Sequence, residues 1–145
     1  MAYMNQDKKK ALAPQIKAVL AKYGVKASIA VRNHSSLVVN IKSGALDFIG
    51  AANKHNKQYS EQRGTHYYEV KGDYQVNPYW EVEHMQKVGE NKIANFFKEL
   101  FAAMNGKDSS IANHNNSDIQ TDYFDVGWYI DVNVGDYNKP YNLVK

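Results

Sequence analysis

The sequence predicts an α+β two-layer sandwich, in which helices cover one face of a small antiparallel-type sheet of three or four strands. Three observations predict this class: two helical stripes of apolar residues, three segments in which apolar and polar residues alternate, and a length of 145 residues. Each alternating segment has a single apolar face, which is typical of a sheet covered on one side. We therefore expect residues 1–145 to form a single domain.

Two amphipathic helices are predicted to cover the sheet. The first lies within residues 5–23, whose apolar side chains form one stripe that ends at Gly24. Pro14 lies inside this segment, so the pattern fits either one kinked helix or a turn followed by a helix. The second helix spans residues 90–104, and a shorter one is expected over 78–85, where an asparagine precedes a proline.

Extended segments supply the predicted sheet. Residues 26–43 alternate in two runs and predict a hairpin, and residues 126–134 predict a further strand with Trp128 on its apolar face. Residues 61–76 fit either a strand or a packed loop, and residues 45–60 begin with a short apolar patch and then turn polar.

Composition excludes several classes of protein. The chain has no cysteine, which excludes disulfides, thiolate zinc sites and cysteine nucleophiles. It has no apolar run near the ~20 residues that cross a membrane, and its first residues lack the apolar core of a secretory signal. We expect an intracellular protein that binds no membrane and needs no cofactor.

Charge is distributed unevenly along the chain. Residues 1–63 carry 11 basic and 3 acidic side chains, whereas residues 64–145 carry 7 and 12. Such asymmetry fits either a nucleic-acid surface or two halves that pack against each other. Because the net charge is only +3, we favour the second interpretation.

Two segments of the chain carry a family resemblance. KKALAPQIKAVLAKYGVKASIAVRNHSSLVVNIKSGALDFIG (9–50) and DIQTDYFDVGWYIDVNVGDYNKPYNL (118–143) resemble small bacteriophage proteins and the large polyvalent protein-associated domains of phages and mobile elements. The resemblance includes no catalytic motif. It implies a non-enzymatic accessory protein in the cytoplasm of an infected bacterium, of the counter-defence or host-takeover type, that binds a host or phage macromolecule.

Two segments are candidate protein-binding surfaces. Aromatic side chains dominate interface anchors, and acidic side chains complement basic partners. Residues 66–80 hold five aromatic residues, and residues 118–136 hold five aspartates without a lysine or arginine. The alternative for the aromatic residues is that they fill the core. The candidate contacts are Tyr67, Tyr68, Tyr74, Tyr79, Trp80, Asp118, Asp122 and Asp125.

Nucleic-acid binding is a first alternative function. A lysine run at the start of the first helix and cations on the polar face of the sheet would contact phosphates. Asp131 on the same face opposes this, because it repels phosphate. The candidate residues are Lys8, Lys9, Lys10, Arg32 and Lys42.

A small enzyme with a histidine and glutamate acid–base site is a second alternative. A histidine beside carboxylates acts as a general base when a cleft holds them together. The candidates in the tyrosine-rich middle are His66, Glu69, Glu81, Glu83 and His84. The three aspartates Asp118, Asp122 and Asp125 would suit a hard cation, but the calcium-loop pattern is missing, so we expect no metal.

Overall fold

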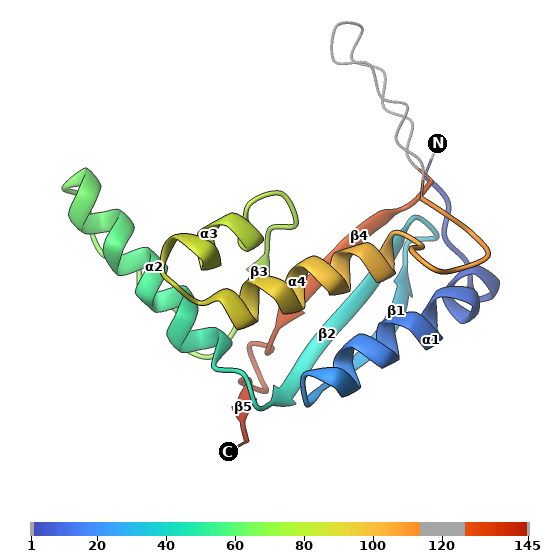
Figure 1. Cartoon of the computed structure of the whole chain (residues 1–145), viewed down its shortest axis with the longest axis horizontal. Helices are drawn as coiled ribbons and strands as arrows, with labels where there is room; N and C mark the ends of the chain where they lie inside the picture. Colours follow the sequence, from blue (N-terminus) through green and yellow to red (C-terminus); the bar gives the residue numbers. More distant parts are fainter. Residues whose placement is uncertain (1, 114–126, 145) are drawn as a thin grey trace, which may run out of the picture.

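The fold, seen in a computed structural model, is the expected two-layer α+β sandwich, described for residues 2–113 and 127–144 (Figure 1). Helices pack on one face of a mixed, open sheet. In chain order the elements are α1 (Gln6–Lys22), β1 (Val25–Arg32), β2 (Ser36–Gly44), α2 (Phe48–Arg63), β3 (Tyr74–Val76), α3 (Glu81–Lys87), α4 (Asn91–Met104), β4 (Tyr129–Val134) and β5 (Asn142–Leu143).

The sheet has five strands in the order β1-β2-β4-β3, with β5 paired to β2. The β1–β2 and β3–β4 pairs are antiparallel, as expected for this type of sheet. The β2–β4 and β2–β5 pairs are parallel, which the sequence analysis does not anticipate. Between β2 and β4 the chain forms α2, β3, α3 and α4, and such a long crossover is what parallel neighbours require.

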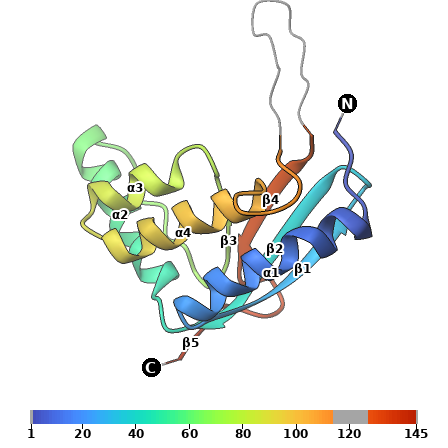
Figure 2. The same cartoon turned by 45° about the vertical axis from the view of Figure 1, so that its right-hand side comes forward.

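The core lies between the sheet and helices α1 and α4 (Figure 2). Trp128 is buried directly before β4, and its indole nitrogen donates a hydrogen bond to the carbonyl of Met104 at 3.0 Å. The strands contribute Leu37, Val39, Ile41, Val132 and Val134, and the helices contribute Leu12, Ile16, Leu20, Phe96, Phe97 and Leu100. The predicted inner face of the sheet is therefore confirmed.

For the helices, the structure decides between two open alternatives in one place and differs from the prediction in two others. Helix α1 runs unbroken through the exposed Pro14, so the single-helix alternative holds. Residues 48–63, expected only as a short apolar patch with a polar continuation, form α2. Helix α3 begins at Glu81 rather than at residue 78, because residues 78–80 form a turn before it.

The second face of the sheet is polar. Asp131 is buried on this face, where it forms an ion pair with Arg32 of β1 and accepts a hydrogen bond from Gln75 at 3.3 Å. The Asn133 amide donates to Asn40 at 3.1 Å on the neighbouring strand. These pairs explain how a carboxylate is tolerated in the middle of a strand. Within the described residues, no helix has the length and hydropathy required to cross a bilayer.

Candidate protein-binding surface

Four of the five aromatic residues predicted to bind a partner lie on the surface. Tyr79 and Trp80 are 85% and 54% exposed, and they occupy the turn between β3 and α3. Tyr68 and Tyr67 are 74% and 37% exposed, and they lie on the connection between α2 and β3. We call these the two aromatic pairs; one lies on each of the connections that flank β3.

Side chains of α2 hold the first aromatic pair in place. The Asn53 carboxamide accepts a hydrogen bond from the backbone amide of Val70 at 2.6 Å and donates one to the carbonyl of the same residue at 2.9 Å. The amide nitrogen of Asn56 donates to the carbonyl of Tyr68 at 3.1 Å. The backbone is thus fixed along α2 while the rings of Tyr67 and Tyr68 point outward.

Asn77 organises the turn that carries the second aromatic pair. Its side chain accepts from the amide of Tyr79 at 2.9 Å, and its carbonyl accepts from the amides of Trp80 at 3.2 Å and Glu81 at 3.0 Å. Asparagine favours such turns because its side chain bonds the backbone two residues further on. The exposed rings of Tyr79 and Trp80 therefore stand on an ordered turn.

Tyr74 is different from the other four aromatic residues. It lies at an inward position of β3, packs against the core, and has a buried hydroxyl. In the described structure, neither this hydroxyl nor Glu81 Oε2 has a hydrogen-bond partner of normal geometry. Tyr74 is thus placed as a core residue, as in the alternative interpretation of this segment.

The environment of Tyr74 and Glu81 shifts both of their acid–base equilibria. Burial raises the pKa of the Glu81 carboxyl to about 7, and the nearby Tyr74 hydroxyl opposes this shift with a smaller effect. Burial and the charge of Glu81 raise the pKa of Tyr74 well above its ordinary value. Because Glu81 is buried at the start of α3, the protonation of its carboxyl is linked to the stability of the fold.

The histidines and glutamates proposed as an acid–base site are not gathered in a cleft. His84 of α3 stacks on His55 of α2, with ring centroids 4.0 Å apart, and burial together with His55 lowers the pKa of His84. Glu83 pairs with Lys87 at 3.3 Å on the surface, and His66 and Glu69 are exposed on the preceding connection. In the described part of the chain, no three histidine or acidic side chains are placed to share a metal ion.

The basic residues proposed to bind nucleic acid are also dispersed. The Lys8 ammonium donates to the carbonyl of Tyr3 at 2.9 Å and lies over the rings of Tyr3 and Trp128. Arg32 forms an ion pair with Asp131, and Lys42 is exposed near the C-terminal end of β2. Lys9 is half-buried and Lys10 is exposed. These five cations therefore do not form one patch. Asp118, Asp122 and Asp125 lie outside the described residues.

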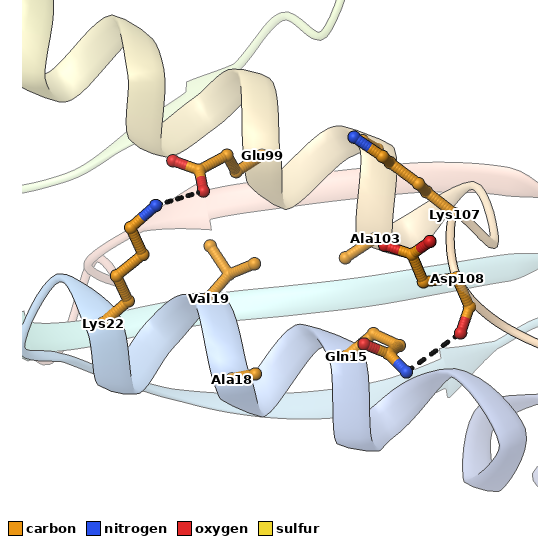
Figure 3. Close-up of a pocket in the computed structure, with 9 residues that line it drawn as sticks. Gln15, Ala18, Val19, Lys22, Glu99, Ala103, Lys107 and Asp108 are labelled. Carbon is orange, nitrogen blue, oxygen red and sulfur yellow. Dashed lines mark hydrogen bonds and ion pairs between the residues drawn. The ribbon is translucent and has the colours of Figure 1, made fainter.

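A shallow groove between α1 and α4 is the feature that the sequence analysis misses (Figure 3). It encloses about 220 Å³ and is bridged by an ion pair between Lys22 and Glu99 at 2.7 Å. Glu99 also accepts from the Tyr23 hydroxyl, and hydrogen bonds from Lys22 and Tyr23 lower the pKa of the Glu99 carboxyl. The groove is lined by two lysines and two acidic residues, Lys22, Lys107, Glu99 and Asp108, so its formal charges balance, and it is best explained as the seam between two packed helices.

Comparisons with models of protein families, with curated protein sequences and with solved structures find no match to this chain. The assignment of function therefore depends on the surface features described above.

Proposed function

We propose that this is a non-enzymatic accessory protein that binds another protein through the two aromatic pairs. The observation that carries the proposal is the exposure of Tyr79 and Trp80, at 85% and 54%, on a turn that hydrogen bonds hold rigid. Tryptophan and tyrosine dominate the energetic centres of protein interfaces. An exposed ring on an ordered backbone loses little conformational freedom on binding, so more of its burial energy becomes affinity.

The finer part of the proposal comes from the family resemblance of residues 9–50 and 118–143. It is that the partner is a host or phage protein in the cytoplasm of an infected bacterium, and that binding serves counter-defence or host takeover. An enzyme is less well supported, because the candidate histidines and glutamates do not share a cleft within the described residues.

Affinity capture with matched variants tests this function. The tagged protein is mixed with a lysate of the bacterial host, and retained proteins are quantified for wild type, for the double variant Tyr79→Ala and Trp80→Ala, and for Tyr137→Ala. Tyr137 is 88% exposed on the connection between β4 and β5, which makes it a matched control. We expect one stoichiometric partner, retained by Tyr137→Ala and lost from the double variant.

Two outcomes contradict the proposal. One is that wild type retains no stoichiometric partner. The other is that the double variant, still folded by circular dichroism, retains the partner as well as wild type does.

A further inference from the structure

Strand β1 forms one outer edge of the sheet, at the opposite side from β3 (Figure 1). It is eight residues long and pairs only with β2 among the described strands. An edge strand of this length presents a row of backbone amides and carbonyls to which another extended chain can pair.

The hydrogen bonds of β2 identify which groups of β1 are free. The carbonyls of Ser35, just before β2, and of Ile41 accept from the amides of Tyr129 and Gly135, so between Ser36 and Ile41 the odd-numbered residues of β2 direct their backbone groups toward β4. The backbone amides and carbonyls of the even-numbered residues in this part of β2 therefore point toward β1, where Val38 lies opposite Ala30. By the same alternation, Ala27, Ile29 and Val31 of β1 direct their amides and carbonyls away from the sheet.

The side chains along this edge also have apolar surface to bury. Ala27, Ile29 and Val31 pack against the core but are only half-buried, unlike Leu37 and Val39 on β2. No hydrogen bond within the described residues engages the outward backbone groups of these three residues. An added strand would satisfy the backbone groups and cover the side chains at the same time.

The surroundings of the edge are basic. Lys26 is exposed on β1, and Lys10 and Lys17 are exposed on α1, which covers β1. The two α1 lysines are two helical turns apart, and by helical spacing they lie on the side of α1 away from the α4 groove. The single acidic residue in α1, β1 and β2 is Asp7, in the first turn of α1.

This charge selects the kind of partner. Antiparallel pairing of β1 with a second copy would bring two lysine-bearing edges together, with Lys10, Lys17 and Lys26 on each, which like-charge repulsion disfavours. An extended segment rich in glutamate or aspartate instead meets a complementary rim. We propose that the free edge of β1 binds an extended acidic segment of a partner protein by strand addition.

This inference is independent of the aromatic pairs, which flank the opposite edge of the sheet. Binding of a probe peptide to β1 should be unchanged in the double variant Tyr79→Ala and Trp80→Ala. A failure of one proposal therefore leaves the other intact.

Amide hydrogen exchange of the full chain provides the test. The probe is a short capped peptide of alternating glutamate and valine. Its controls are the same peptide with lysine in place of glutamate, the acidic peptide with a central proline, and oligothymidylate. We expect saturating acidic peptide to slow exchange of the Ala27, Ile29 and Val31 amides by about tenfold or more. The amides of Ser28 and Ala30 already face β2 and should change little.

Charge reversal supplies the matched variants. Lys10→Glu combined with Lys17→Glu should lower the affinity for the acidic peptide by about tenfold. Lys57→Glu combined with Lys92→Glu makes the same change on exposed positions of α2 and α4 and should leave the affinity unchanged. The proposal is overturned if the three edge amides gain no protection, if the lysine or proline peptide binds equally well, or if only oligothymidylate binds.

Discussion

At the scale of single residues, Glu81 is a carboxyl group whose environment differs strongly from that of the free amino acid. It is 6% exposed, and one of its oxygens lacks a hydrogen-bond partner among the described residues. A carboxylate in such a place is costly as an anion and much less costly as a neutral acid. The folded protein therefore holds a proton here that the unfolded chain releases at lower pH.

This proton makes stability depend on pH in a defined direction. The pKa of Glu81 is about 7 in the folded protein and ordinarily 4.5. The stabilisation from its raised pKa is therefore complete below pH 4.5 and is lost as the pH rises through about 7. The loss amounts to at most about 3 kcal/mol. We expect Glu81→Gln, which stays neutral, to remove this decline.

Urea denaturation of wild type and Glu81→Gln across this range measures the effect. The difference in unfolding free energy between the two proteins isolates Glu81, because the opposing contribution of His84, whose pKa is lowered, is common to both. Two curves that stay parallel from about pH 5 to 8 would show that Glu81 ionises normally.

Asn53 bonds both backbone groups of Val70, two residues after Tyr68, and so holds the connection that carries the first aromatic pair. Asn53→Ala removes two hydrogen bonds and leaves the Val70 amide without its partner, so we expect a loss of about 2 kcal/mol in unfolding free energy. Asn56→Ala removes an exposed hydrogen bond to the carbonyl of Tyr68 and a long contact with the His55 ring at 3.5 Å, and should lower the unfolding free energy by about 0.5 kcal/mol or less. Chemical denaturation of both variants measures this, and equal losses would contradict the role of Asn53.

At the scale of elements, α4 contributes half of the buried aromatic residues of the core, namely Phe96, Phe97 and Phe101. Phe97 is fully buried and its ring centroid lies 5.3 Å from that of Phe48 at the start of α2. Phe97→Ala should therefore lower the unfolding free energy by about 4 kcal/mol. The adjacent Lys98 is exposed, and Lys98→Ala should change it by less than about 0.5 kcal/mol. Thermal and urea unfolding of both variants measure these changes. A small loss of unfolding free energy in Phe97→Ala would contradict the position of Phe97 in the centre of the core.

The elements also show which parts of the fold the sequence is able to predict. Helices α1 and α4 and the β1–β2 hairpin were predictable within one or two residues, because each buries one apolar face and keeps a regular period. Helix α2 was not, because its few buried residues lie near its two ends and most of its surface is polar. Strand β3 has three residues, too few to show an alternation.

At the scale of the whole molecule, long-range pairing is what the sequence did not reveal. A single strand has the same alternation whether its neighbour is parallel or antiparallel, so the β2–β4 pairing was not readable. Which aromatic residues are exposed was not readable from the sequence either, because it depends on how distant parts of the chain pack together. Tyr74 and Tyr79 belong to one short segment, yet the first points into the core from β3 and the second stands on a turn.

The central claim is that the surface around Tyr79 binds another protein. Site-specific photo-crosslinking in a lysate of the bacterial host tests it most directly, with a photoreactive phenylalanine at position 79 or, as a control, at position 137, two comparably exposed sites. The account predicts one discrete adduct from position 79 and none of that mass from position 137. No adduct from position 79, or the same adducts from both positions, would contradict it.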